Sequence, residues 1–313
     1  MQAASPFDFP IGLGTWSWGD ESTWGYGKEY SEADLRQAFR TAVARGVRLF
    51  DTAEVYAGGQ SERLLGMFAG ELDESARKEI VVASKFMPWP WRLSGGSLNR
   101  SLKASLSRLN GQSIGLYQLH RYLPPVPFET WIHRLADAYE AGAIGNIGLS
   151  NCKADQVYRA HLILSRRGIP LASNQVLYNL LHREIEFDGT LDACKELKVS
   201  MLAYSPLSMG LLTGKYTVSS PPPGKRGKFT TASHLEQVSY LLDAMGAIGE
   251  RNGNRTVTQV ALRWIMSKGL IPIPGIKNSR QAADILGTLD WDFTSNDLEL
   301  LDSLSSIFSK EGK

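Results

Sequence analysis

The stretch VRLFDTAEVYAGGQSERLLGMFAG, residues 47–70, decides the fold of this chain. It opens with VRLFDTA at 47–53, a short and largely apolar run that is typical of a β-strand covered on both faces. After a turn rich in glycine, SERLLGMFAG at 61–70 has its apolar residues at the spacing of an amphipathic helix. A strand that leads directly into a helix is the repeating unit of α/β folds with parallel strands.

The same strand–helix pattern recurs on both sides of this stretch. The predicted strands cover residues 11–18, 47–53, 80–86, 114–120, 144–151, 171–178, 200–206 and 270–276. The predicted helices cover residues 31–46, 61–70, 97–110, 127–142, 153–168, 186–198, 256–269 and 279–289, with an added helix at 295–307. Ser31 and Asp34 open the first helix with the spacing of a capping box. Eight such units favour a closed (β/α)8 TIM barrel over an open sheet.

The composition is that of an ordinary globular protein, with 43% hydrophobic residues, 21% charged residues and a net charge of +2. This balance does not call for a nucleic-acid or anionic-membrane partner. No apolar run approaches the ~18 residues of a membrane helix. Because no break in composition divides the chain, we expect a single domain over residues 1–313, with PPPGKRGKF at 221–229 as a mobile loop.

The remaining global features concern location and redox state. The N-terminal segment has neither signal-peptide nor transit-peptide features, so we expect a cytoplasmic protein, with a plastid left open if a transit peptide has been removed. The two cysteines, Cys152 and Cys194, are expected to be reduced thiols. The five histidines show no metal-binding spacing, so no metal is expected. The oligomeric state stays open.

Four polar residues follow the predicted strands at their carboxyl ends, where the reactive groups of such barrels gather. They are Asp51, Tyr56, Lys85 and His120. A tyrosine has an ordinary pKa of ~10, and a nearby ammonium lowers it. We therefore expect Lys85, held by Asp51, to lower the pKa of Tyr56, while His120 donates to a substrate oxygen or relays a proton. Singly, such residues are usually caps, solvated groups or packing; together at matched strand ends they indicate acid–base chemistry.

Five motifs carry a resemblance to a known family. GVRLFDTAEVYAGGQSERLLG at 46–66 resembles the signature of the aldo-keto reductase superfamily, which centres on DTAxxY. VVASKF, IGLYQLH, GAIGNIGLSN and IPIPGIKNSRQAADILG resemble the family's lysine strand, histidine strand, amide-binding strand and cofactor phosphate loop, in the family's order. The resemblance implies an enzyme that reduces a small-molecule aldehyde or ketone with NADPH. It also implies that the four polar residues form a catalytic tetrad with Tyr56 as general acid.

The resemblance implies a set of contacts to NADPH/NADP+ as well. Those to the nicotinamide would come from Ser150, Asn151 and Gln175, which bind its carboxamide, and from Tyr204, which stacks on its ring. Those to the pyrophosphate and adenosine would come from Ser205, Leu207, Gly210, Gly275, Lys277, Ser279, Arg280 and Gln281.

Two of these residues also have a physical argument. Lys277 and Arg280 are cations near a predicted helix N-terminus, which suits the 2′-phosphate that distinguishes NADPH from NADH. The chain departs from the family at Asp284 and Ile285, where the family often has an acidic residue followed by Asn. This departure predicts the loss of an amide contact to adenine.

Aromatic residues crowd the loops that we expect at this face of the barrel. Trp18, Trp24, Trp89 and Tyr122 are expected to line a pocket for aromatic or apolar carbonyl compounds. The competing interpretation for each ring is that it packs its loop onto the barrel.

Two other functions are compatible with the sequence. One is a cofactor-binding redox sensor or regulatory subunit with little turnover, for which the potassium-channel β subunits of this superfamily are the precedent. The other is a barrel lyase or isomerase without cofactor. Oxidation of NADPH with a panel of aldehydes separates the reductase from both.

Overall fold

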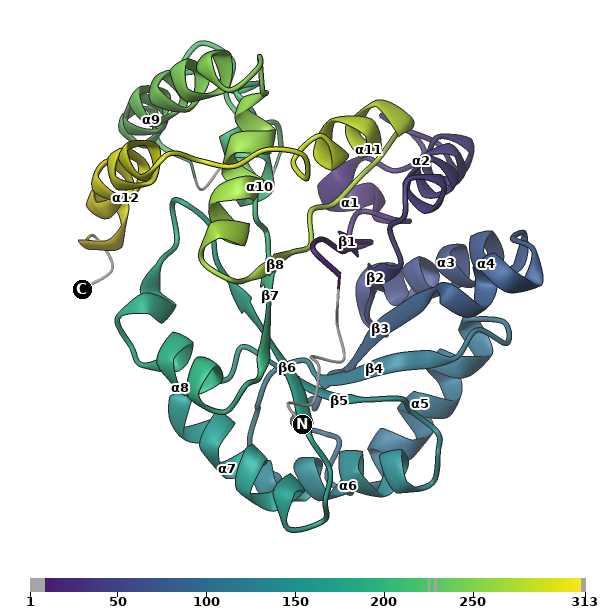
Figure 1. The fold of residues 1–313 in the computed structure, drawn as a ribbon. Coiled ribbons are helices and arrows are strands. Elements are labelled where there is room, and N and C mark those ends of the chain that lie inside the picture. Colours follow the sequence, from purple (N-terminus) through teal and green to yellow (C-terminus); the bar gives the residue numbers. More distant parts are fainter. Residues whose placement is uncertain (1–8, 225, 228–229, 311–313) are drawn as a thin grey trace.

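A single eight-stranded sheet forms the centre of the molecule. The computed structural model describes residues 9–224, 226–227 and 230–310. Its strands are all parallel and follow one another in the sheet in the order of the sequence. Figure 1 shows helices in a ring around them. The strands are β1 Leu13–Gly14, β2 Leu49–Asp51, β3 Val81–Phe86, β4 Ile114–Leu119, β5 Ile147–Ser150, β6 Leu171–Leu177, β7 Ser200–Tyr204 and β8 Ile271–Pro272.

Backbone hydrogen bonds join the two ends of the sheet. The amide of Gly12 donates to the Pro272 carbonyl oxygen over 3.0 Å, and that of Gly14 donates to the Pro274 carbonyl oxygen over 2.9 Å. A parallel bridge also pairs Gly14 with Gly275. These contacts close the sheet, so the predicted (β/α)8 barrel is confirmed.

The predicted helices are present, and each lies within a few residues of its expected bounds. Ser31 and Asp34 form the predicted capping box, because the Ser31 hydroxyl accepts from the Asp34 amide and the Asp34 carboxylate accepts from the Ser31 amide. The expected helices are α2 Glu32–Ala44, α3 Gln60–Gly70, α5 Gly96–Arg108, α6 Phe128–Glu140, α7 Ala154–Ser165, α8 Thr190–Glu196, α10 Val257–Ser267, α11 Ser279–Leu286 and α12 Ser295–Lys310.

Some elements were not predicted. They are the short helices α1 Glu21–Trp24 and α4 Glu74–Glu79, the long helix α9 Ala232–Arg251, and the 3-10 helices η1 Tyr56–Gly59, η2 Glu184–Glu186 and η3 Ser208–Thr213. Helix α9 lies between β7 and α10 and packs beside α12 outside the ring (Figure 1). The expected mobile loop at 221–229 precedes it, and residues 225, 228 and 229 lie outside the described part of the chain.

The inside of the barrel has an apolar half and a polar half. Leu49, Ala83, Leu116, Ala172 and Leu202 form a buried cluster that fills the half nearer the amino ends of the strands. Side chains alternate along a strand, so the residue two positions further on points inward again. In β2, β3 and β4 these next residues are Asp51, Lys85 and Gln118, all buried. The strands therefore deliver polar groups at their carboxyl ends.

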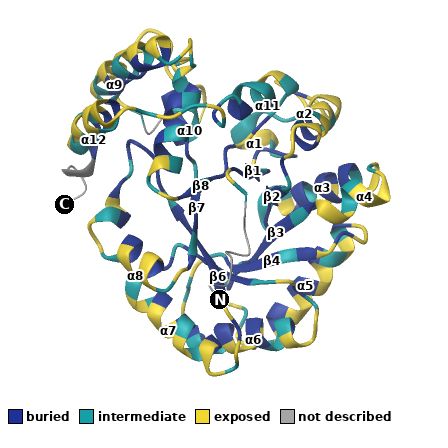
Figure 2. Ribbon diagram, in the orientation of Figure 1, coloured by how far each residue is buried: buried dark blue, intermediate teal, exposed yellow. Residues whose placement is uncertain are grey.

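The outward faces of the helices are exposed, whereas the strands are largely buried (Figure 2). Within the described residues, no helix combines the length and the apolar character needed to cross a bilayer.

Candidate active site

Asp51, Lys85 and Tyr56 are joined through the ammonium of Lys85. Its Nζ lies 2.5 Å from Asp51 Oδ2 and 3.2 Å from Tyr56 Oη, and it donates to the Thr52 carbonyl oxygen over 2.9 Å. Neighbouring strands β2 and β3 supply the ion pair, and η1, which follows β2, supplies the tyrosine. The Lys85 side chain is completely buried. Such a cation is costly without a carboxylate beside it, and Asp51 meets that requirement.

The pKa of the Tyr56 hydroxyl differs from the expectation. Burial raises this pKa above its ordinary value and Asp51 adds to the rise, while the Lys85 ammonium lowers it. Lys85 thus acts in the predicted direction, but the net shift is upward, because loss of water outweighs the attraction of the ammonium. Burial alone would lower the pKa of Lys85, but the Asp51 carboxylate, with a smaller contribution from Tyr56, outweighs burial and raises this pKa. The site therefore holds a neutral phenol beside an ammonium.

His120 completes the group of four. Its ring lies edge-on to the Tyr56 ring, with 5.8 Å between the ring centroids. Burial, reinforced by the positive charges of Lys85 and Arg121, lowers the pKa of His120 to about 3. Its Nδ1 is buried and has no hydrogen-bond partner among the described residues. The imidazole is thus neutral near pH 7 and has spare hydrogen-bonding capacity.

Two glutamines support the second oxygen of Asp51. Gln175 Nε2 donates to Asp51 Oδ1 over 2.7 Å, and Gln118 Nε2 does so over 3.3 Å. Gln118 was not among the predicted site residues, although its place two residues before His120 on an inward-facing position was a usable signal. Gln175, predicted as a carboxamide contact, uses its amide nitrogen on Asp51. Its amide oxygen has no partner among the described residues.

The predicted carboxamide residues cluster at the ends of β5 and β7. Asn151 Nδ2 donates to Ser150 Oγ over 3.0 Å and to the His120 carbonyl oxygen over 3.1 Å. Asn151 Oδ1 accepts from the Tyr204 hydroxyl over 2.9 Å. The Tyr204 ring, predicted to stack on the nicotinamide, is therefore fixed beside the tetrad by its hydroxyl. The sequence did not predict this hydrogen bond between Tyr204 and Asn151.

The backbone after β7 is unusual over the residues predicted to line the pyrophosphate path. Ser205, Ser208, Met209 and Gly210 all have positive φ angles, between 45° and 100°. Such angles cost energy for residues other than glycine and concentrate at ligand-binding loops. Leu207, also predicted here, precedes η3 and accepts from the Gly210 amide over 2.9 Å. The five residues form one tight turn.

The predicted adenosine contacts lie around the start of α11. Asn278 caps this helix, since its side chain accepts from the Gln281 amide, and Gln281 in turn accepts from the Lys277 amide over 2.9 Å. Ser279 and Arg280 form the first turn, and the Arg280 side chain is exposed with no ion pair to a described carboxylate. The strand end at Gly275 leads into this turn. Asp284, where the family pattern is broken, accepts from Thr256 Oγ1 over 2.8 Å and ties α11 to α10.

Lys277 itself points at the loop around α1. Its Nζ donates to the Trp24 carbonyl oxygen over 2.8 Å and lies 3.6 Å from the Glu29 carboxylate. It also lies 5.1 Å from the centroid of the Trp24 ring and 4.5 Å from that of Tyr30. Burial lowers the pKa of Lys277 to about 8, with Glu29 opposing the shift. A bound anion beside the Lys277 ammonium would stabilise its charged form and offset the effect of burial.

Arg226 is a second cation here that the sequence did not single out. Its guanidinium lies 5.0 Å from the centroid of the Trp24 ring, and it donates to the Tyr216 hydroxyl over 2.9 Å. The side chain is buried, its Nε has no hydrogen-bond partner and no described carboxylate pairs with it. A buried, unpaired arginine near the positive-φ turn is what an anionic ligand needs. The basic residues of the segment 221–229 were the sequence feature that could have predicted a cation near the cofactor site.

The predicted substrate residues divide into two groups. Trp24, at the end of α1, and Trp89 and Tyr122, in loops after β3 and β4, are partly buried. Trp18 is fully buried, contacts Phe39 and Phe68, and donates its Nε1–H to the Ile276 carbonyl oxygen over 3.1 Å. The prediction for Trp18 is therefore wrong, because residues 16–19 form a turn after β1 that directs the Trp18 indole into the core.

Trp16 is the aromatic ring that reaches the tetrad instead. Its centroid lies 6.4 Å from that of Tyr56, and its ring is 39% exposed. It packs edge-on against Trp24 with 5.4 Å between centroids. The same aromatic loop contained this residue, but the sequence did not say which indole faces outward.

Cys152 and Cys194 are free, buried thiols. Burial raises the pKa of Cys152 to about 12 and that of Cys194 to about 11. Both are protonated at neutral pH and are poor nucleophiles.

Comparison with known proteins identifies the family of this chain. The model of the aldo/keto reductase family matches residues 10–306. A protein of Arabidopsis thaliana named "Pyridoxal reductase, chloroplastic" is 40% identical over 298 residues, which cover 92% of this chain and 80% of that protein. The solved structure of the thermostable aldo-keto reductase Tm1743, in complex with the inhibitor epalrestat, has a TM-score of 0.75 and 28% identity over 95% of each chain.

A second solved structure supports the fold alone. The glycerol dehydrogenase AKR11B4 from Gluconobacter oxydans has a TM-score of 0.82 at 24% identity, covering 98% of this chain and 95% of that one. With the family model matched over nearly the whole sequence and the relatives covered over most of their length, this chain belongs to the aldo/keto reductase family of oxidoreductases.

Proposed function

We propose that this protein reduces aldehydes or ketones to alcohols with NADPH, with Tyr56 as the general acid. The observation that carries the proposal is the 3.2 Å distance between Tyr56 Oη and the Lys85 ammonium, which Asp51 holds at 2.5 Å. Bound NADPH supplies a hydride to the carbonyl carbon. Tyr56 gives its proton to the carbonyl oxygen as negative charge develops there, and Lys85 stabilises the phenolate that remains.

His120 has a separate role in this proposal. A neutral imidazole can donate a hydrogen bond to the substrate oxygen without adding a charge that would repel the Lys85 ammonium. The low pKa of His120, about 3, supports this neutral form. Asp51 acts through Lys85, and Gln118 and Gln175 hold Asp51 in place.

The cofactor proposal rests on one free acceptor and on three cations near the ends of the strands. The free amide oxygen of Gln175 suits the amino group of a carboxamide, with Ser150 and Asn151 beside it and Tyr204 against the ring. Lys277 and the exposed Arg280 suit a 2′-phosphate, and Arg226 suits the pyrophosphate at the turn of residues 205–210. The remaining predicted contacts, Gly275, Ser279 and Gln281, would surround the adenosine.

Pyridoxal is the first substrate to test. The Arabidopsis relative is named a pyridoxal reductase, and pyridoxal is an aromatic aldehyde, which matches a site walled by Trp16, Trp24, Trp89 and Tyr122. A panel of pyridoxal, benzaldehyde and an aliphatic aldehyde, followed by NADPH absorbance, ranks the substrate classes. Faster reduction of the aliphatic compound than of both aromatic ones would contradict the aromatic wall.

Tyr56→Phe tests the proton donor. We expect kcat for reduction to fall by about 10²–10⁴-fold, as for loss of a general acid, while the NADPH Kd stays close to that of the wild type. Tyr158→Phe, which alters an exposed tyrosine on α7, is the matched control and should keep full activity. Wild-type kcat in Tyr56→Phe would remove Tyr56 from the mechanism.

The alternative function is a cofactor-binding redox sensor or regulatory subunit. It requires tight NADPH binding with negligible turnover on every carbonyl tested. The intact group of Asp51, Tyr56, Lys85 and His120 favours turnover, and the substrate panel decides between the two.

Two further proposals concern the whole chain. We propose residues 1–313 as one domain, which limited proteolysis tests by yielding no stable internal fragments. We propose the cytoplasm as its location, with a plastid as the competing one because the Arabidopsis relative is named chloroplastic. A fluorescent fusion of the chain, imaged in its own cells, separates these locations.

A further inference from the structure

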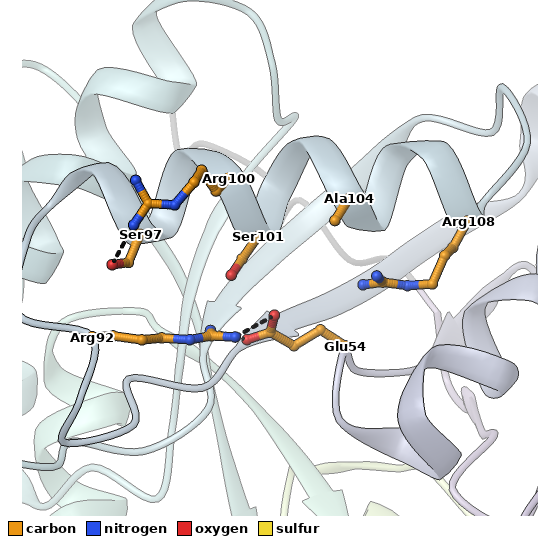
Figure 3. Close-up of a pocket in the computed structure, with 7 residues that line it drawn as sticks. All are labelled: Glu54, Arg92, Ser97, Arg100, Ser101, Ala104 and Arg108. Atoms are coloured by element: carbon orange, nitrogen blue, oxygen red, sulfur yellow. Dashed lines mark hydrogen bonds and ion pairs between the residues drawn. The ribbon is translucent and has the colours of Figure 1, made fainter.

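A polar cavity lies outside the barrel, between α5 and the loops that follow β2 and β3 (Figure 3). Its volume is about 280 Å³. Arginines and serines dominate its lining, and none of its residues belongs to the tetrad or to the proposed cofactor contacts. The lining residues are Glu54, Arg92, Ser97, Arg100, Ser101, Ala104 and Arg108.

The only carboxylate in this lining is already neutralised. Glu54 Oε1 accepts from Arg92 Nη1 over 2.6 Å and from the Met87 amide over 2.7 Å. Glu54 Oε2 accepts from Arg92 Nη2 over 3.2 Å. The Glu54 side chain is only 7% exposed. It therefore fixes Arg92 at one wall of the cavity and, within the lining, offers no carboxylate to Arg100 or Arg108.

The other two arginines keep unused N–H groups. Arg108 Nε donates to the buried Glu62 over 2.6 Å and Nη2 donates to Ser105 over 3.1 Å, so its Nη1 has no partner among the described residues. Arg100 donates only to Ser97 Oγ, over 3.2 Å, and pairs with no described carboxylate. Ser101, which faces Arg92 and Glu54 in Figure 3, has no described hydrogen-bond partner for its hydroxyl.

The cavity thus has more donors than acceptors and more positive than negative charge. Three arginines line the cavity with one carboxylate, Glu54, and Glu62 pairs with Arg108 from outside the lining. An oxyanion with several acceptor oxygens matches this surplus, because guanidinium groups bind phosphate through paired N–H donors. A cation would be repelled, and a neutral ligand would leave the charge uncompensated. We propose that this cavity binds a phosphate group, either of inorganic phosphate or of a small phosphate ester.

Phosphate binding in this cavity can be followed by the fluorescence of two nearby tryptophans. Arg92 also donates to the Met87 carbonyl oxygen over 2.9 Å, and the two residues bracket Trp89 and Trp91. The indoles of these tryptophans are stacked, with 5.1 Å between centroids. A phosphate that engages Arg92 is therefore expected to change tryptophan fluorescence, independently of any turnover.

The test is titration of the full chain with inorganic phosphate at constant ionic strength, followed by calorimetry and tryptophan fluorescence. We expect saturable binding that persists in Lys277→Ala, which weakens the proposed cofactor phosphate site. Arg100→Gln should weaken it by about tenfold, since a hydrogen bond to a charged group contributes about 1.5–3 kcal/mol and 1.4 kcal/mol is a tenfold change. Glycerol 3-phosphate is the second probe, and tighter binding than inorganic phosphate would assign the site to an ester.

Two further variants make the test specific. Ala104 is exposed on α5, so Ala104→Leu fills the cavity with a good helix former and should weaken phosphate at least as much as Arg100→Gln. Arg166→Gln removes an exposed arginine at the end of α7 that does not line the cavity, so it should leave phosphate binding unchanged. The proposal is overturned by absence of saturable binding to the wild type, or by equal phosphate affinity in the wild type, Arg100→Gln and Ala104→Leu.

Discussion

At Tyr56 two opposite effects act on one hydroxyl group. Burial removes the water that would solvate a phenolate, whereas the Lys85 ammonium would stabilise that phenolate. Burial has the larger effect, and the pKa of Tyr56 is raised. For carbonyl reduction this direction is useful, because the acid must carry its proton at the start. An alkoxide is a far stronger base than a phenolate, given a pKa of about 16 for water and ~10 for tyrosine. The proton therefore moves readily from Tyr56 to the new oxygen.

This ordering predicts the pH dependence of reduction. The rate should be full below the pKa of Tyr56 and should be lost as the pH rises through it, so the decline begins only above pH ~10. His120, whose pKa is about 3, should add no transition between pH ~5 and ~8. The measurement is kcat/KM for one aldehyde at saturating NADPH, from pH ~5 to ~11. A limb near pH 6.5 that disappears in His120→Gln would contradict the neutral imidazole.

Lys277 predicts a separate pH effect on cofactor choice. The pKa of its amino group in the cofactor-free protein is about 8, so this group is charged below pH 8 and loses its charge above pH 8. NADPH affinity should fall by about tenfold for each pH unit above 8, until the complex itself titrates, while NADH affinity stays flat. Fluorescence titrations at pH 7 and 9 measure both. Lys277→Arg, which stays charged, should bind NADPH equally at the two pH values, and a parallel loss for NADH would refute the 2′-phosphate role.

At the scale of elements, helix ends are where single side chains matter most. Ser31→Ala removes the side-chain half of the capping box at α2 and should lower the free energy of unfolding by about 1 kcal/mol. Ser303→Ala, at an exposed position inside α12, is the control and should change it by less than about 0.5 kcal/mol. Urea denaturation measures both. Equal effects of the two substitutions would mean that the capping box does not stabilise α2.

The elements also show what the sequence could predict. Alternation of strands and helices is local, so the barrel and its helices follow from spacing alone. Helix α9 was missed although Leu235, Val238, Leu241, Met245 and Ile248 repeat at helical spacing, because a proline- and glycine-rich segment before it suggested one long loop. Its place outside the ring depends on packing with α12, which spacing does not contain.

Most residues of the site could be predicted from the sequence, as could most of the strands and helices. Strand ends placed Asp51, Tyr56, Lys85 and His120 on one face of the barrel, and the resemblance gave them the roles of a catalytic tetrad. The sequence did not predict which way the Trp18 side chain points, nor that burial would raise the pKa of Tyr56. These depend on which neighbours remove water, and those neighbours come from other strands and helices.

At the scale of the whole molecule, the seam between β1 and β8 joins the two ends of the barrel to the proposed cofactor site. Gly14 is hydrogen-bonded to Pro274 across this seam, and residues 275–277 lead from it to Lys277. A Cβ at Gly14 would lie 3.0 Å from the Ile273 carbonyl oxygen. That oxygen belongs to the backbone, so the seam itself would have to shift.

Gly14→Ala should therefore act on stability and on the cofactor together. We expect the free energy of unfolding to fall by about 1–3 kcal/mol, as for overpacking, and the NADPH Kd to rise because the turn carrying Lys277 moves with β8. Gly70→Ala is the matched control: its Cβ meets nothing within 4 Å at the end of α3, so it should be neutral or stabilising. Denaturation and NADPH titration of both variants separate the effects. Loss of stability without any change in NADPH Kd would show that the seam closes the barrel but does not position the phosphate site.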